Sequence, residues 1–134
     1  MGFKNLELAD GAAVTPVGTG TRSVLALKGT VVKGNATVRS GENVPVVLDG
    51  TIRYPENVGT LKLVGDVRTN GEKVKLELAT IKGVHRLLDL SEVDTALTLD
   101  DFELTGTAPQ PLKMDLQNGI LRVWRDVSTA IFFR

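Results

Sequence analysis

The most regular hydrophobic pattern in the chain lies in TLKLVGDVRTNGEKVKLELATI, residues 60–81. Apolar side chains at Leu61, Leu63 and Val67 alternate there with residues that are mostly polar or charged. A period of two with one apolar side is typical of a half-buried antiparallel sheet. The pair Asn70-Gly71 interrupts the alternation, and it tolerates the positive φ angles of a tight type I′ turn. The pattern therefore predicts a central β-hairpin with its turn at this pair.

Shorter apolar stretches precede this hairpin, and clusters of Gly, Pro, Asn and Asp separate them. Residues 1–32 predict an N-terminal hairpin that turns at Asp10-Gly11. Residues 36–104 predict the main antiparallel sheet, with a bulge at Asp100-Asp101 where the alternation breaks. We expect about six or seven strands in all, within a single domain that spans residues 1–134.

The last stretch, residues 111–134, has a helical period instead. Its apolar positions recur every three or four residues and form one stripe, at Leu116, Ile120, Trp124, Val127 and Ile131. The sequence thus predicts an α+β fold, an antiparallel sheet with a C-terminal helix that Asn118-Gly119 could kink. One helix cannot cover such a sheet, so we expect an intertwined dimer in which a second copy supplies the cover. The predicted dimer interface comprises Ile120, Trp124, Val127 and Ile131.

Composition adds little to this picture. The chain has 134 residues, of which 42% are hydrophobic, and a mean hydropathy of +0.04, as in globular proteins. It contains no cysteine, which excludes disulfides and thiolate metal sites. No stretch is long and apolar enough to span a membrane, and the first residues lack the apolar core of a signal peptide. We therefore expect a cytoplasmic product without a membrane partner.

Catalytic chemistry has no clear signature in the sequence. None of the common nucleotide-binding, hydrolase or metalloprotease motifs occurs. The one histidine, His85, is expected to be a surface residue. Asp100, Asp101 and Glu103 cluster, but they lack the spacing of a calcium loop and are expected to form a solvated strand end. We predict no enzyme activity, no cofactor and no metal.

The polar side of the central hairpin is the best functional candidate. A two-residue turn at Asn70-Gly71 would place four cations on one face, namely Lys62, Arg68, Lys73 and Lys75. In this register Asp66 would lie opposite Lys75 and form a salt pair with it. Formal net charge is zero, from 16 basic and 16 acidic residues, so only a local basic face could bind nucleic acid. The predicted RNA-binding set adds Arg53, Tyr54, as a possible base-stacking ring, and Thr60. The alternative is an ordinary solvated sheet face.

The order of these parts resembles the coat proteins of single-stranded RNA bacteriophages, the levivirus-like family. The opening FKNLELADGAAVTPVGTGTRSVLALKG is similar to that family's N-terminal hairpin. The charged hairpin at residues 60–81 resembles its RNA-facing sheet, and the apolar end of the chain resembles its helical region. The family usually has two C-terminal helices, whereas here only Asn118-Gly119 offers such a break.

The resemblance implies a capsid protein that dimerises and self-assembles into an icosahedral shell. It further implies that the inner sheet face binds and packages single-stranded genomic RNA, and that the protein resides in the virion after assembly in the bacterial cytoplasm. Two other readings remain open at this point. One is a different phage structural β-module, such as a decoration or tail protein, and the other is a β-barrel that binds a small ligand.

Overall fold

The computed structural model describes residues 2–3, 6–17, 24–56, 59–81, 83–107 and 111–125. Within these ranges the chain forms fifteen β-strands and one short 3₁₀ helix, η1 (Leu99–Asp101). Consecutive strands mostly turn a corner into a different sheet instead of pairing with each other. The result is a coil with three sides, which we name sheets A, B and C after the order in which the chain visits them.

Each sheet collects one strand from each successive coil. Sheet A has four strands, in the order β1 (Gly2–Phe3), β4 (Leu25–Leu27), β7 (Val46–Leu48) and β10 (Val67–Thr69). Sheet B has five, in the order β2 (Leu6–Leu8), β5 (Thr30–Val32), β8 (Thr51–Tyr54), β11 (Val74–Leu78) and β13 (Phe102–Gly106). Sheet C has six, in the order β3 (Ala13–Val14), β6 (Ala36–Arg39), β9 (Leu61–Gly65), β12 (His85–Val93), β15 (Ile120–Arg125) and β14 (Leu112–Gln117).

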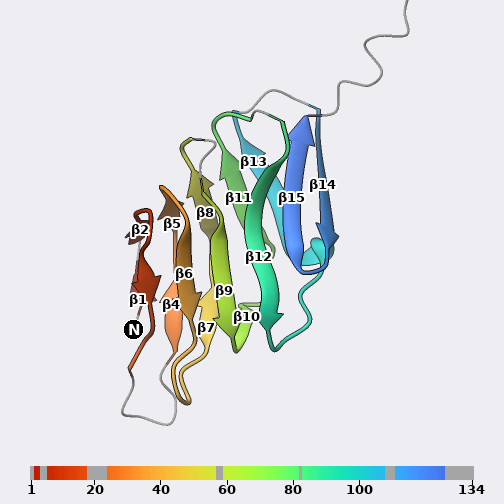
Figure 1. Cartoon of the computed structure of the whole chain (residues 1–134). Helices are drawn as coiled ribbons and strands as arrows, with labels where there is room; N and C mark the ends of the chain where they lie inside the picture. Colours follow the sequence, from red (N-terminus) through yellow and green to blue (C-terminus); the bar gives the residue numbers. More distant parts are fainter. Residues whose placement is uncertain are drawn as a thin grey trace, which may run out of the picture.

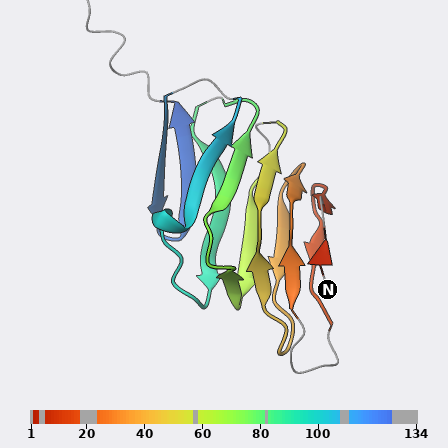
Figure 2. The same cartoon turned by 180° about the vertical axis from the view of Figure 1, so that it is seen from behind.

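Neighbouring strands from successive coils run parallel and in register. In sheet A, Leu25 lies beside Val46, which lies beside Val67. In sheet B, Ile52 lies beside Leu76, which lies beside Leu104. The chain is therefore a parallel β-solenoid, whose coils stack from the N-terminal end to the blue C-terminal end in Figure 1. The same order of coils is seen from the opposite side in Figure 2.

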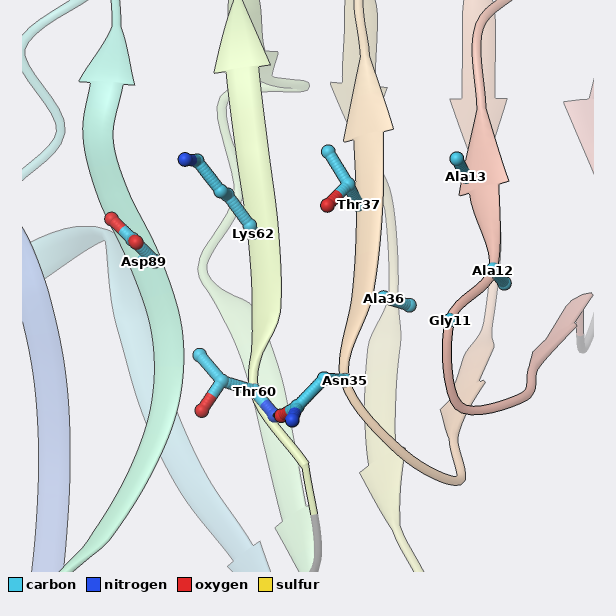
Figure 3. Close-up of a pocket in the computed structure, with 9 residues that line it drawn as sticks. All are labelled: Gly11, Ala12, Ala13, Asn35, Ala36, Thr37, Thr60, Lys62 and Asp89. Atoms are coloured by element: carbon cyan, nitrogen blue, oxygen red, sulfur yellow. The ribbon is translucent and has the colours of Figure 1, made fainter.

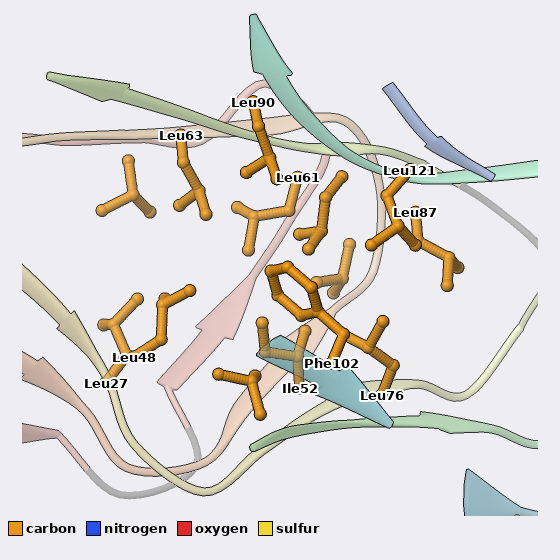
Figure 4. Close-up of a cluster of buried hydrophobic side chains, with 14 of the residues drawn as sticks. Leu27, Leu48, Ile52, Leu61, Leu63, Leu76, Leu87, Leu90, Phe102 and Leu121 are labelled. Atoms are coloured by element: carbon orange, nitrogen blue, oxygen red, sulfur yellow. The ribbon is translucent and has the colours of Figure 1, made fainter. Parts of the chain in front are cut away.

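Alternation along each strand explains the core. One side chain in two points inward, so leucine, valine and isoleucine from all three sheets meet between them (Figure 4). Leu61, Leu63 and Leu76 are fully enclosed, with 0% of their surface exposed. Each coil alone could not bury these residues, and stacking makes the core continuous from coil to coil.

A glycine recurs at the corner between sheets A and B. Gly29, Gly50 and Gly71 occupy this corner in successive coils, with φ angles of 116°, 96° and 95°. Such angles are strained for any residue with a Cβ atom, so glycine allows the chain to turn there. In the last of these corners the Asn70 amide also donates a hydrogen bond to Asp49 of the preceding coil, at 2.7 Å.

The C-terminal part departs from the regular coil. Strand β13 adds to sheet B in parallel, but β14 and β15 form an antiparallel hairpin, and β15 joins sheet C antiparallel to β12. The hairpin turns at Asn118-Gly119, whose φ angles of 53° and 80° are both positive. These are the angles of a type I′ turn, which Asn-Gly strongly favours. Strand β14 thus becomes the outer edge of sheet C.

Three fold predictions are wrong. The α+β fold with a main antiparallel sheet over residues 36–104 is replaced by parallel sheets, and the N-terminal hairpin of residues 1–32 by parallel pairs of β1 with β4 and β2 with β5. Asp10-Gly11 is a turn, as predicted, but it leads from sheet B to sheet C. The central hairpin of residues 60–81 is one coil, because β9, β10 and β11 belong to three different sheets.

The predicted C-terminal helix is also wrong. Residues 112–117 and 120–125 are strands, because Asn118-Gly119 turns the chain where a helix would have to continue. Of the predicted dimer interface, Ile120 and Trp124 lie on β15, an inner strand of sheet C, and Val127 and Ile131 lie outside the described residues. Because residues 112–117 and 120–125 are strands, there is no helix to exchange between copies within the described residues, and the predicted intertwined dimer loses its basis. None of the described segments forms a helix long and apolar enough to cross a membrane.

Candidate functional site

The predicted RNA-binding cations do not form one face. Lys62 lies on sheet C, Arg68 on sheet A, and Lys75 on sheet B, with Lys73 just before the same strand. The hairpin prediction placed all four on one side because it folded the two arms against each other. In the solenoid, successive polar residues point outward from successive sides, so the same alternation distributes the charges around the molecule.

Three of the five cations in the predicted RNA-binding set, Lys62, Arg68 and Arg53, contact acidic neighbours. Lys62 forms a salt bridge with Glu92 of the next coil, and this partner raises the pKa of the lysine. Arg68 binds both carboxylate oxygens of Asp66 at 2.8 Å, an arrangement that raises the pKa of Arg68. The predicted pair of Asp66 with Lys75 is therefore wrong. Arg53, which lies beside Glu77 in register, contacts that carboxylate at 3.2 Å.

Two further residues of the predicted RNA set serve the fold. Tyr54 is buried, with 1% of its surface exposed, and its hydroxyl donates a hydrogen bond of 2.8 Å to the carbonyl oxygen of Leu87. It cannot stack on a base, and the ring packs in the core. The Thr60 hydroxyl donates to the carbonyl oxygen of Arg86 at 2.8 Å, and its N–H donates to the Asn35 side chain. These bonds join successive coils on the outside of sheet C.

His85 is buried, contrary to the prediction of a surface residue, with 7% of its surface exposed. Its ring lies edge-on to Tyr54 at 5.7 Å, and Nε2 lies 3.0 Å from the carbonyl oxygen of Gly59. That carbonyl oxygen accepts a hydrogen bond from Nε2–H, so the neutral ring carries its hydrogen on Nε2. Burial lowers the pKa of His85, which keeps the ring neutral. The residue therefore acts as a core side chain.

The acidic cluster near residue 100 separates in the structure. Asp101 accepts a hydrogen bond of 2.8 Å from the N–H of Thr98 and so caps η1. Glu103 lies on sheet B, in register with Lys75. Among the described residues no group of three or more His, Cys, Asp or Glu is placed to hold a metal ion.

A shallow groove of about 300 Å³ crosses the outer face of sheet C (Figure 3). Small side chains form it, and its lining residues are Gly11, Ala12, Ala13, Asn35, Ala36, Thr37, Thr60, Lys62 and Asp89. Its polar groups are largely engaged within the protein. Besides the Thr60 and Lys62 contacts, the Asp89 carboxylate accepts from the N–H and hydroxyl of Ser91 at 3.0 and 2.6 Å. The groove therefore offers a ligand few unsatisfied groups.

The C-terminal end of the solenoid carries a second candidate site, which we name the C-terminal mouth. It is a cluster of half-buried apolar side chains that pack on the last layer of the core, namely Leu97, Leu99, Leu104, Leu112, Met114 and Leu116. They come from the segment around η1, from β13 and from β14, one group on each side of the coil. No further coil covers them among the described residues.

Two edge strands border the C-terminal mouth. Strands β13 and β14 are the outermost strands of sheets B and C, five and six residues long. Within the part of the chain that the structure describes, the strands at the N-terminal end, β1, β2 and β3, have two or three residues each. Short edges are one of the ways in which proteins avoid pairing with other chains, and long edges invite it. The two ends of the solenoid therefore differ in their capacity to pair.

The β14–β15 hairpin fixes which groups of β14 are free. Its closing pair is Gln117 with Ile120, and in a two-residue turn this pair exchanges both hydrogen bonds. Bonded and non-bonded pairs then alternate along the hairpin. Residues 113, 115 and 117 consequently bond to β15, whereas the N–H and C=O groups of Leu112, Met114 and Leu116 point to the open edge.

Side-chain contacts hold this hairpin firmly. Arg122 on β15 binds both carboxylate oxygens of Asp115 on β14, at 2.9 and 2.6 Å, and also reaches Gln117 at 3.2 Å. The arginine lowers the pKa of Asp115, so the carboxylate stays charged. Arg122 also lies 5.9 Å from the centre of the Trp124 ring. These contacts hold β14, the strand with the open edge, against β15.

Comparison of the chain with protein-family models, with curated proteins and with solved structures finds no match in any of the three.

Sequence reasoning missed the C-terminal mouth, although two signals pointed to it. Asn118-Gly119 is the same dipeptide that predicts a turn at Asn70-Gly71, and it favours a hairpin turn here too. The segment LKMDLQ alternates apolar and polar residues with a period of two. Together they describe a β-hairpin whose first strand has an apolar side.

Proposed function

We propose that this chain is a structural protein whose copies associate through the C-terminal end of the solenoid. The observation that carries the proposal is the C-terminal mouth, where half-buried leucines lie beneath long edge strands whose outer backbone groups pair with no described strand. Association would bury both features at once, because apolar area leaves water and edge N–H and C=O groups find partners.

Charge supports a second copy as the partner. The chain has a formal net charge of zero, so copies do not repel one another through their overall charge. Strand β14 carries one cation and one anion on its outer side, Lys113 and Asp115, so the edge is itself balanced.

The remaining surface favours no other activity. His85 is buried and neutral, Asp101 caps η1, and the polar groups of the groove on sheet C are largely engaged within the protein. The predicted basic RNA face has no counterpart, because its cations lie on different sheets. Of the expectations from coat proteins, the proposal keeps self-association as a structural role, but through a different surface from Ile120 and Trp124.

Sedimentation velocity of the full chain over a wide concentration range tests the proposal. We expect the wild-type chain to associate and Met114→Pro to sediment as a monomer. Proline removes an N–H that points to the open edge, so it blocks pairing without breaking a bond inside the hairpin. Met114→Val is the matched control, because it keeps the N–H and an apolar side chain, and it should still associate. A wild-type chain that stays monomeric at every concentration would defeat the proposal.

A further inference from the structure

The outward-pointing groups of β14 restrict how two copies could join. The backbone groups of Leu112, Met114 and Leu116 face the edge of sheet C that no described strand covers, and their side chains pack on the core. In an antiparallel pair, residues directly opposite each other point to the same side. Two β14 strands related by a two-fold axis must therefore match inward residues with inward residues, and charged outward residues with each other.

One register satisfies the charges. If Met114 lies opposite the partner's Met114, then Leu112 lies opposite the partner's Leu116, and Lys113 lies opposite the partner's Asp115. The two-fold axis repeats the last two contacts on the other side. Met114 then forms a pair that exchanges both hydrogen bonds, and Lys113 faces Asp115 in the closer, non-bonded type of pair.

The neighbouring registers are penalised. A shift by two residues in one direction places Lys113 opposite its own copy, and a shift in the other direction places Asp115 opposite its own copy. Like charges directly opposite each other in a sheet are destabilising. A shift by one residue turns every apolar side chain of one strand to the solvent side. The sequence LKMDLQ is thus self-complementary in a single antiparallel register.

We propose that two copies form a closed two-fold dimer by antiparallel pairing of β14 with the partner's β14, centred on Met114. This inference rests on the proposed self-association and specifies its geometry. The pairing joins two copies of sheet C into one continuous sheet. A two-fold axis perpendicular to that sheet keeps both cores on the same side, so the two C-terminal mouths meet beneath it. The interface is isologous and closed, so association stops at the dimer.

A charge-swap experiment tests the register. Lys113→Asp should place Asp opposite Asp115 of the partner, and Asp115→Lys should place Lys opposite Lys113. Each variant alone should show a dimer dissociation constant raised by at least about tenfold. An equimolar mixture of the two should form heterodimers, because one chain then carries two acidic and the other two basic residues on the outer side of β14. Lys28→Asp, an exposed lysine between β4 and β5 in the second coil, is the control for the change in net charge and should dimerise normally.

The outcomes separate the two proposals. Single variants that dimerise weakly, together with an equimolar mixture that dimerises like the wild type, support the register. Single variants that dimerise like the wild type, or weak variants whose mixture does not recover, overturn the register, while wild-type association would still uphold the proposed function. A monomeric wild type overturns both.

A cysteine at the centre gives a second measurement in case Asp115→Lys, which loses its bond to Arg122, fails to fold. The chain has no cysteine, so Met114→Cys introduces a single thiol at the two-fold axis. Mild oxidation should convert it to a covalent dimer, whereas Lys28→Cys, in the second coil, should stay monomeric. Equal cross-linking of both variants would contradict the register.

Discussion

The hydrogen bond from Tyr54 to Leu87 should contribute measurably to stability, and Tyr54→Phe removes it. Leu87 and Leu88 are both fully buried although they are consecutive, and the pairing of β12 with β15 shifts between Arg86 and Leu88. Leu87 is therefore the extra residue of a bulge, a place where ladder bonding is disrupted. The Tyr54 hydroxyl, at 2.8 Å, satisfies its carbonyl group inside the core.

Loss of this partner leaves a buried carbonyl unsatisfied. Such a group costs about 1–3 kcal/mol, so the free energy of unfolding of Tyr54→Phe should fall by that amount. Urea unfolding followed by fluorescence of the one tryptophan, Trp124, measures the change. Thr60→Val is a matched control, because it removes a hydroxyl bond of the same length to the preceding residue, Arg86, on the outside of the protein. Water can replace that bond, so the control should change by less than about 0.5 kcal/mol.

The alkaline behaviour of the same residue provides an independent check. Burial raises the pKa of Tyr54 above its ordinary value. The folded chain then keeps a proton that the unfolded chain loses above about pH 10, so stability is present below that pH and falls as the pH rises above it. Tyr54 is the only tyrosine, so tyrosinate absorbance should appear only as the chain unfolds. Ionisation at an ordinary pKa in the folded chain, or wild-type stability for Tyr54→Phe, would refute the reasoning.

Other positions give further predictions. Thr30→Val should raise the free energy of unfolding, measured by urea denaturation, by about 1 kcal/mol, because the buried Thr30 hydroxyl has no hydrogen-bond partner among the described residues. Because the pKa of His85 is lowered in the folded chain, the unfolded chain binds a proton first as the pH falls. The free energy of unfolding should therefore fall below about pH 6.5, by at most about 1.4 kcal/mol per pH unit. Urea unfolding at several pH values measures this slope, and His85→Gln should remove it. Gly119→Ala should lower the thermal midpoint in calorimetry, because a Cβ there would lie 2.6 Å from Ser91 Cα at a φ of 80°; an unchanged midpoint would contradict the turn geometry.

The sequence predicted strands well and their arrangement badly. Alternation in residues 60–81 identified the inward residues Leu61, Leu63, Val67 and Leu76 correctly, and all are buried. Alternation reports only which side chains share the core, however, and both a hairpin and a three-sided coil satisfy it. Asn70-Gly71 has the positive φ that was expected at Gly71, but it turns a corner between sheets instead of reversing the chain.

A repeat would have distinguished the two folds. The segments LALKG, VVLDG and VRTNG end at Gly29, Gly50 and Gly71, and each is a strand of sheet A followed by the same corner. The repeat is weak in sequence because strand and loop lengths differ from coil to coil in sheets B and C, as in the bulged pairing of β12 with β9. The charges alone could not show whether a basic face exists. A hairpin would gather Lys62, Arg68 and Lys75 on one face, whereas the coil places them on three different sheets.

The C-terminal region shows the opposite failure. Leu116, Ile120 and Trp124 have helical spacing, but Leu116 also alternates with Asp115 and Gln117 in strand β14. Short apolar stretches fit either period, and the Asn-Gly turn decides between them. The strand assignment brings Lys113 and Asp115 to one outer edge, and no helical reading places them there.

Engineered cysteine pairs test the three-sided coil most directly, because the chain has no cysteine of its own. Thr51 and Lys75 lie side by side on parallel strands β8 and β11, at the spacing of about 4.8 Å that neighbouring strands have, which suits a disulfide. A central hairpin would instead place Lys75 opposite Asp66, which in the coil lies beyond sheet A. Under mild oxidation at low concentration, Thr51→Cys/Lys75→Cys should lose both thiols to an intramolecular disulfide, and Asp66→Cys/Lys75→Cys should keep them free. The reverse result would contradict the solenoid.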